Sequence, residues 1–167
     1  MAETLRDIYN VSPDIKWPND VMIGGRKACG ILVESSTQSN RIDFAVLGIG
    51  VNLGQEAFPE EIRATATSML KETGLLIAPD DLLGPLLGHL ERWYKLIATS
   101  PDLVIRRWED LSTYARDCRV TVISGDSTFE GTTAGLNLAG ALVIELPGGD
   151  KREVFSGEVS LRKVTSD

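Results

Sequence analysis

A short stretch near the start of the chain gathers residue types that can bind a charged ligand. Residues 16 to 34 read KWPNDVMIGGRKACGILVE, which places the Asn19-Asp20 pair between Lys16 and Lys27. Carboxylate and amide oxygens are the ligands that Mg²⁺ prefers, often together with the phosphates of a nucleotide. A lysine ammonium holds a carboxylate or phosphate and stabilises negative charge that develops during a reaction. The stretch therefore indicates a site for an anionic ligand such as a magnesium–nucleotide complex.

Each of these residues also has an ordinary structural explanation. An Asn-Asp pair after proline commonly forms a turn that bonds to its own backbone. Strand lysines such as Lys16 and Lys27 commonly protect a sheet edge from aggregation. Lys27, however, comes just before the apolar run ACGILVE. Its ammonium is therefore predicted to lie at the margin of a buried sheet, where a cation can hold an anionic ligand.

Three glycines interrupt the apolar strands that follow. Gly30 lies in ACGILVE, and Gly48 and Gly50 lie in GIGVN. Glycine inside a strand lowers stability, and its usual explanation is a bulge or the close approach of another backbone or a ligand. GIGVN is not a phosphate loop, because no Gly-Lys-Ser or Gly-Lys-Thr follows it. On neighbouring strands, these glycines would form a flat floor for a planar ligand.

The remaining polar candidates carry weaker signals. His89 is the only histidine and lies in an apolar helical pattern, so a Ser-His-Asp triad is a poor explanation for this chain. Cys29 and Cys118 fit no metal-ligand spacing and are predicted to be reduced packing thiols. Glu158 and Arg162, four apart in SGEVSLRKV, would share one face of a strand. There they form either a surface ion pair or contacts with a bound nucleotide.

The elements that position these residues predict an α+β fold. A helix is expected at residues 2–9 and strands from 15 to 53, followed by helices at 80–100 and 101–111. After Tyr114, five short β-rich runs with glycine turns predict a small barrel. We therefore expect a mixed or antiparallel sheet with packed helices over residues 1–114, and a small β-barrel domain over residues 115–167.

Local signals refine these elements. Gly24-Gly25 predicts a two-residue hairpin turn with positive φ. PEEI predicts a short helical turn with Pro59 at its start. Pro85 disfavours a regular helix over residues 80–100, so that helix is expected to start late or to bend. The helix at residues 2–9 begins at the first residue without a cap, which is unusual for a complete domain.

Charge and hydropathy exclude several classes of partner. The 167 residues carry a net charge of −7, and the sequence pI is about 4.8. An acidic chain without a basic cluster repels phosphate backbones, so nucleic acid and anionic membranes are poor candidates. We find no membrane-spanning stretch and no signal peptide, and we expect a cytoplasmic protein.

Taken together, the motifs resemble a known family. KWPND, RKACGIL, GIGVN and FPEEIRATATSM, in this order, resemble the second half of the catalytic domain of biotin protein ligases. GTTAGLNLAGALVIEL and SGEVSLR are similar to the SH3-like C-terminal domain of the same family. The resemblance covers nearly the whole chain and implies a partial class II synthetase-like ligase domain followed by an SH3-like domain.

The resemblance implies a two-step reaction and its partners. Biotin is the substrate and ATP, with Mg²⁺, is the cofactor. The biotin carboxylate attacks the α-phosphate of ATP, and pyrophosphate leaves. A lysine of a biotin carrier protein, such as the carrier subunit of acetyl-CoA carboxylase, then attacks the biotinyl-adenylate.

The resemblance also implies a role for each matching residue. Lys27 resembles the catalytic lysine that contacts the biotin carboxylate and the adenylate phosphate. The glycines look like the backbone lining of the biotin pocket, and the remaining matches resemble polar groups near the nucleotide. The implied biotin-binding positions are Gly30, Gly48 and Gly50, and the implied ATP and metal vicinity is Asn19, Asp20, Asn52, Glu158 and Arg162.

One departure from the family pattern limits the expected activity. The family's Gly-Arg-rich adenylate loop and its Ser-Thr and Gln residues precede KWPND, and they do not occur in this sequence. Without that loop, transition-state stabilisation of several kcal/mol is lost. We therefore expect a weak or inactive ligase when the chain is alone, with an apolar sheet edge that a homodimer or an added segment would cover. The alternative is a non-catalytic module that binds biotin or a carrier protein.

Overall fold

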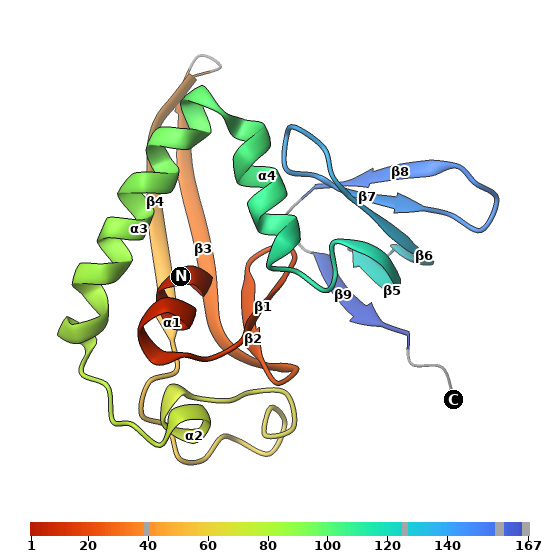
Figure 1. Cartoon of the computed structure of the whole chain (residues 1–167). Helices are drawn as coiled ribbons and strands as arrows, with labels where there is room; N and C mark the ends of the chain where they lie inside the picture. The colour runs from red at the N-terminus through yellow and green to blue at the C-terminus, as the bar shows by residue number, and fades with distance from the viewer. Residues whose placement is uncertain (39–40, 125–126, 156–158, 165–167) are drawn as a thin grey trace. The chain divides into compact units, whose positions relative to one another are not determined.

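Two antiparallel sheets with helices confirm the α+β class that the sequence predicts. The structure is a computed structural model that describes residues 1–38, 41–124, 127–155 and 159–164 (Figure 1). Its residues form two compact units. The first unit comprises Met1–Pro13 and Asn19–Leu86, and the second comprises Asp14–Pro18 and Leu87–Asp167.

The first unit is built on an antiparallel sheet in which β2, β3 and β4 are neighbours in that order. The turn between β2 and β3 is the predicted Gly24-Gly25 hairpin turn, with φ of 56° and 74°. Glycine adopts these values without the steric cost that a Cβ would add. The elements of this unit are α1 (Ala2–Tyr9), β2 (Asp20–Ile23), β3 (Arg26–Gln38), β4 (Arg41–Val51) and α2 (Met69–Thr73), with the start of α3 (Pro79–Thr99).

The core of the first unit lies at the end of the sheet where β2 and β3 meet. Val21, Ala28 and Cys29 are almost fully buried there, with 2%, 0% and 1% exposure. The predicted first helix is present as α1, and its Leu5 is fully buried. This end of the sheet therefore has a packed interior around the turn that precedes Lys27.

Two predictions about helices in this unit are refined by the structure. α3 begins at Pro79 and continues through Pro85, so it does not start late. Asp80 and Asp81 lie in its first turn, where acidic side chains favour the positive end of the helix dipole. The helical turn predicted at PEEI is present as turns, in which Ile62 N donates to Pro59 O at 3.1 Å.

The second unit contains the five short strands predicted after Tyr114. They form one antiparallel sheet in the order β8-β7-β6-β5-β9, and no ladder joins β8 to β9 among the residues that the structure describes. Trp17 packs into the apolar core of this unit. The elements are β1 (Pro13–Lys16), α4 (Pro101–Asp110), β5 (Arg116–Ser124), β6 (Ser127–Leu136), β7 (Leu142–Glu145), β8 (Lys151–Val154) and β9 (Val159–Lys163), together with the end of α3.

Residues 14–18 belong to the second unit, where Asp14 and Ile15 of β1 make polar contacts. Asp14 accepts hydrogen bonds from Thr113 N at 2.7 Å and from Thr113 Oγ1 at 2.6 Å. Ser112 Oγ donates to Ile15 O at 2.5 Å. The domain boundary near Ala115 stays a prediction.

No helix among the described residues is long and apolar enough to cross a membrane.

Candidate functional site

The Lys27 side chain lies against Gly30 and forms an ion pair with Asp20. Its Nζ is 2.6 Å from Asp20 Oδ1, an oxygen that is buried from solvent. A Cβ added to Gly30 would lie 3.1 Å from both Cε and Nζ of Lys27. Asp20 is also the ladder partner of Gly30, so all three residues lie on one face of the sheet. The Lys27 side chain is 46% exposed and can therefore meet a ligand above this face.

Gly48 and Gly50 continue the same face along β4. Gly50 is the ladder partner of Gly30, and Gly48 is the partner of Leu32. A Cβ at Gly50 would be 3.9 Å from Gly30 O, and a Cβ at Gly48 would be 3.7 Å from Leu32 O. These are ordinary van der Waals distances, so packing within the chain does not require glycine at either position. We call the surface formed by Gly30, Gly48 and Gly50 the glycine face.

The two predicted asparagines bond to main-chain carbonyls around Lys27. Asn19 Nδ2 donates to Ile31 O at 2.7 Å. Asn52 Nδ2 donates to Thr67 O at 2.9 Å and to Lys27 O at 3.4 Å. Both amides therefore hold the strands that carry the site, and their role near ATP and magnesium stays a prediction.

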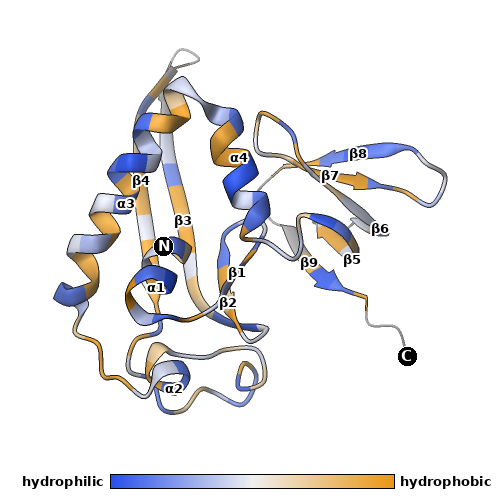
Figure 2. Ribbon diagram, in the orientation of Figure 1, coloured by the Kyte–Doolittle hydropathy of each residue, from blue (hydrophilic) through white to orange (hydrophobic). Residues whose placement is uncertain are grey.

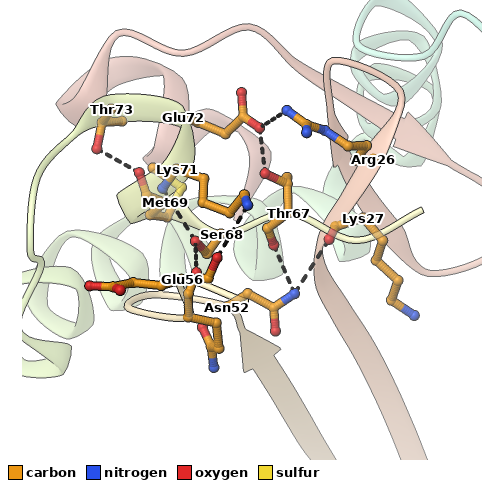
Figure 3. Close-up of polar contacts among 11 residues, drawn as sticks. Arg26, Lys27, Asn52, Glu56, Thr67, Ser68, Met69, Lys71, Glu72 and Thr73 are labelled. Atoms are coloured by element: carbon orange, nitrogen blue, oxygen red, sulfur yellow. Dashed lines mark hydrogen bonds and ion pairs between the residues drawn. The ribbon is translucent and has the colours of Figure 1, made fainter. Parts of the chain in front are cut away.

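Sequence reasoning missed the contacts that hold the Lys27 main chain. Lys27 N donates to Thr65 O at 2.7 Å, and Thr67 N donates to Lys27 O at 2.9 Å. Glu72 Oε1 accepts from Arg26 Nη2 at 2.7 Å and from the Thr67 hydroxyl. Figure 3 shows Arg26 reaching toward Glu72 while the Lys27 side chain extends away from it. The main chain of Lys27 is therefore fixed independently of its ammonium.

A local signal could have found the helix that carries Glu72. α2 follows Ser68, whose Oγ accepts from Lys71 N at 3.2 Å, and it ends at Gly74 with a φ of 73°. A serine before a helix is an ordinary start signal, and a glycine after it is an ordinary stop signal. No local signal indicates the pairing of Glu72 with Arg26, because it joins residues that only the fold brings together.

No described contact brings Glu158 or Arg162, the site residues predicted near the end of the chain, to the glycine face. Arg162 is exposed in β9 and is the ladder partner of Thr121. Glu158 lies outside the described residues. Within the described ranges, no three His, Cys, Asp or Glu side chains are grouped to hold a metal ion. The binding of Mg²⁺ together with ATP stays a prediction.

Beyond the glycine face, β3 and β4 expose large apolar side chains. Leu32, Phe44 and Val46 lie on the side of the glycine face and are 58%, 56% and 54% exposed. Val33 and Leu47 lie on the opposite side and are also exposed. Figure 2 shows the apolar segments along both strands. We call these five residues the apolar sheet surface; exposed patches of this kind commonly mark interaction sites.

The thiol nearest to Lys27 is not a nucleophile. Burial raises the pKa of Cys29 to about 11, and the positive charges of the N-terminus and of Lys27 oppose this rise only in part. Cys29 precedes Gly30 in the strand, so its side chain points to the other face of the sheet. The protonated, buried thiol therefore acts as a packing group.

Two family models match separate parts of the chain. The model described as "Biotin/lipoate A/B protein ligase family" matches residues 1–52, which include the glycine face. The model described as "Biotin protein ligase C terminal domain" matches residues 118–162, which include most of the second sheet. The matches follow the order of the sequence motifs.

Two curated relatives match most of the chain. The bifunctional ligase/repressor BirA of Bacillus spizizenii is 31% identical over 155 residues, which cover 90% of this chain and 47% of the relative. The biotin–[acetyl-CoA-carboxylase] ligase of Paracoccus denitrificans is 32% identical over 154 residues, which cover 86% of this chain and 62% of the relative. The chain thus spans about half the length of the first relative.

Solved structures of a biotin protein ligase from Aquifex aeolicus are similar to this chain. The apo structure has 30% sequence identity and a TM-score of 0.85, and the match covers 98% of this chain and 71% of that one. The structure in complex with biotin and ATP has 29% identity and a TM-score of 0.82, and covers 98% and 67% of the two chains. These likenesses agree with the α+β fold described above.

Proposed function

This chain belongs to the biotin protein ligase family, and from this membership we propose that its glycine face is the biotin and adenylate part of a ligase active site. One observation carries the proposal. Gly48 and Gly50 are exposed, and packing within the chain does not require glycine at either position, while the Lys27 ammonium lies beside Gly30, the ladder partner of Gly50. A flat ring system fits on bare strands, and an anionic group fits next to the ammonium.

The proposed reaction has two steps. In the first, a carboxylate oxygen of biotin bonds to the α-phosphorus of ATP, and the bond to pyrophosphate breaks. In the second, the amine of a carrier-protein lysine attacks the acyl carbon, AMP leaves and the amine loses a proton. ATP enters with Mg²⁺, which supplies positive charge to the departing pyrophosphate.

The residues of this chain would bind and orient the reacting groups. Lys27 stabilises the negative charge shared by the carboxylate and the α-phosphate. Asp20 holds the ammonium above Gly30, since their 2.6 Å ion pair restricts where the flexible lysine side chain can lie. Asn52 keeps the Lys27 main chain in place through its bonds to Lys27 O and Thr67 O.

The proposal also covers the activity of the chain alone, its partners and its location. We propose a weak or inactive ligase when the chain is alone, because the apolar sheet surface exposes side chains on both sides of β3 and β4 and thus indicates an incompletely covered active-site domain. A biotin carrier protein as acceptor, a homodimer and a cytoplasmic location belong to the same proposal. The net charge of −7 argues against nucleic acid as a partner.

Pyrophosphate release from biotin and Mg-ATP tests the activity. The chain is assayed alone and with the polypeptide that corresponds to the unmatched part of the Aquifex aeolicus enzyme. We expect release only in the second case, and we expect Lys27→Ala to lower it about 100-fold, as loss of a transition-state charge partner does. Lys95→Ala, which removes an exposed ammonium paired with Glu91 in α3, is the matched control. Turnover by the chain alone would refute the proposed inactivity.

A non-catalytic binding module is the second candidate function. The apolar sheet surface favours it, because such a surface can bind a carrier protein without any chemistry. Calorimetry separates the two candidates. Binding of biotin or its adenylate that Lys27→Ala weakens supports the ligase. Binding of a carrier protein with no heat from either small molecule supports the module.

A further inference from the structure

One short segment holds both the N–H and the carbonyl of Lys27. Lys27 N donates to Thr65 O at 2.7 Å, and Lys27 O accepts from Thr67 N at 2.9 Å, so Ala66 forms a parallel bridge with Lys27. We call Thr65–Thr67 the Lys27 bracket. A shift of the bracket would therefore shift the Lys27 main chain and the Cα from which its side chain extends.

We propose that Glu72 is a positioning residue that locks the Lys27 bracket, an inference that rests on the function proposed for Lys27. Glu72 Oε1 accepts hydrogen bonds from the Thr67 hydroxyl and, at 2.7 Å, from Arg26 Nη2. Arg26 precedes Lys27 in β3, and Thr67 belongs to the bracket. A single carboxylate oxygen therefore ties the residue before Lys27 to the segment that holds Lys27 (Figure 3).

The alternation of side chains along β3 explains why Glu72 acts at a distance from the ligand. Arg26 and Lys27 are successive strand residues and point to opposite faces, so Arg26 reaches toward Glu72. Lys27 reaches toward Asp20 and Gly30 because the register shift between Val21 and Met22 interrupts the alternation before Gly30. Glu72 thus does not contact the glycine face. It acts only through the position of Lys27, and a misplacement of about 1 Å can lower a rate by about 100-fold.

α2 gives Glu72 a fixed position from which to act. Met69 is fully buried, and its N–H donates to Asn52 O at 2.8 Å. Leu70 N donates to Leu53 O at 2.9 Å, which ties the start of α2 to the segment after β4. The Asn52 side chain returns from this segment to the bracket through Thr67 O at 2.9 Å. The helix that carries Glu72 is therefore joined to the same segment as the bracket.

Burial distinguishes the two contacts of Glu72. Thr67 is fully buried, and the Glu72 side chain is 15% exposed, whereas Arg26 is 40% exposed. A half-exposed ion pair contributes little to global stability, but removing the acceptor of a buried hydroxyl leaves that hydroxyl unpaired. We therefore expect the loss of Glu72 to loosen the bracket locally, mainly through Thr67.

Amide hydrogen exchange on the full chain tests the inference without any ligand. We expect Glu72→Ala to speed exchange at the Lys27 and Thr67 amides at least about tenfold more than at Ile31, whose N–H donates to Asn19 O in the same strand. Glu72→Gln keeps an acceptor for Thr67 and should have a smaller effect. Glu61→Ala, which removes an exposed acid in the neighbouring turn, is the matched control. Equal acceleration at all three amides, or none, would overturn the inference.

A double-mutant cycle tests whether Glu72 acts through Lys27. Binding of a non-hydrolysable biotinyl-adenylate analogue is titrated with the wild-type chain, Glu72→Ala, Lys27→Ala and the double variant. We expect Glu72→Ala to weaken binding about tenfold in the presence of Lys27 and to have no effect in its absence. An equal loss in both backgrounds would overturn the positioning role. If the wild-type chain does not bind the analogue, the proposed function fails in this chain, while the exchange experiment still decides on the bracket.

Discussion

The two antiparallel sheets of this chain use similar apolar residues but bury them to different extents. In the second unit, inward-facing side chains of three strands are fully buried; they are Val120, Val122, Leu142, Ile144 and Leu161. In the first unit, Leu32, Phe44 and Val46 are each more than half exposed. The second sheet therefore completes its own core, whereas much of the first sheet has an apolar surface that this chain does not cover.

The same contrast divides the first sheet along its length. At one end, Ala28 and Cys29 are buried and the main chain of Lys27 is held by Thr65 and Thr67. Further along β3, Leu32 is 58% exposed. The glycine face lies where the buried end passes into the exposed part. A ligand bound there would contact the packed end of the sheet on one side. On the other side, the exposed part of β3 and β4 would need an added polypeptide to shield the ligand from solvent.

The largest expected effect compares a core residue of the second sheet with an exposed residue of the first. Leu161 has no exposed surface, so Leu161→Ala leaves a cavity and should lower the free energy of unfolding by about 3 kcal/mol. Phe44 is 56% exposed, so Phe44→Ala should change it by less than about 0.5 kcal/mol. Urea unfolding of both variants measures the difference. Equal losses would mean that the apolar sheet surface is buried in solution.

A pair of glycine substitutions sharpens the comparison. A Cβ at Gly131 in β6 would collide with Ile144 Cγ2 and lie 2.7 Å from Glu145 O, so Gly131→Ala should destabilise the chain by about 2 kcal/mol. A Cβ at Gly48 would meet only ordinary contacts, so Gly48→Ala should be neutral or stabilise the chain by up to about 1 kcal/mol.

The two glycines should also differ in their effect on ligand binding. Gly48→Ala fills part of the glycine face and should weaken binding of biotin or its adenylate about tenfold, as an overfilled ligand contact does. Thermal unfolding and calorimetry on the same samples measure both quantities. If Gly48→Ala destabilises the chain as strongly as Gly131→Ala, packing explains this glycine and the glycine face loses its main support.

Local signals in the sequence predicted most of the elements of both sheets. Gly24-Gly25 predicted the hairpin turn before Lys27, and alternating short runs predicted the five strands of the second unit. These signals are reliable because turn geometry and strand periodicity depend on neighbouring residues alone. They also placed Gly30 on one strand and Gly48 and Gly50 on the next. They did not place Lys27 on the face of Gly30, because that follows from the register shift between Val21 and Met22.

The contacts that complete the site could not be predicted in this way. Trp17 lies in the same motif as Asp20, yet it packs in the core of the second unit and donates to Gly140 O at 3.2 Å. Glu72 reaches Arg26 across 46 positions of sequence. Such pairs depend on which elements the fold brings together, and no local pattern in the chain specifies them.

The buried end of the first sheet should give the stability of the chain a specific pH dependence. Burial raises the pKa of Cys29 from 9.0 to about 11. The folded state then holds the thiol proton more tightly than the unfolded state, so its stabilising effect is complete below pH 9 and declines as the pH rises toward 11. From pH 9 to pH 10, the wild-type chain should lose about 1 kcal/mol more than Cys29→Ala.

Urea unfolding at several pH values measures this difference. Cys118→Ala is the matched control, because burial also raises the pKa of Cys118 but that thiol is less buried than Cys29. The control variant should keep most of the alkaline destabilisation of the wild-type chain. If Cys118→Ala removes the alkaline destabilisation and Cys29→Ala keeps it, the thiol with the more strongly raised pKa is Cys118 in the second unit, and the prediction is wrong.

The smallest expected change in unfolding free energy tests what the apolar sheet surface does. Val46 is 54% exposed, so Val46→Asp should change the free energy of unfolding by less than about 0.5 kcal/mol. Its added charge should nevertheless suppress association through β4, because a charge on an exposed sheet opposes pairing with another chain. Sedimentation velocity over a range of concentrations measures this association. Leu138→Asp adds the same charge at an exposed leucine of the second unit and should leave association unchanged. If both variants associate like the wild-type chain, the apolar sheet surface does not mediate self-association. A different polypeptide would then be the partner of this surface.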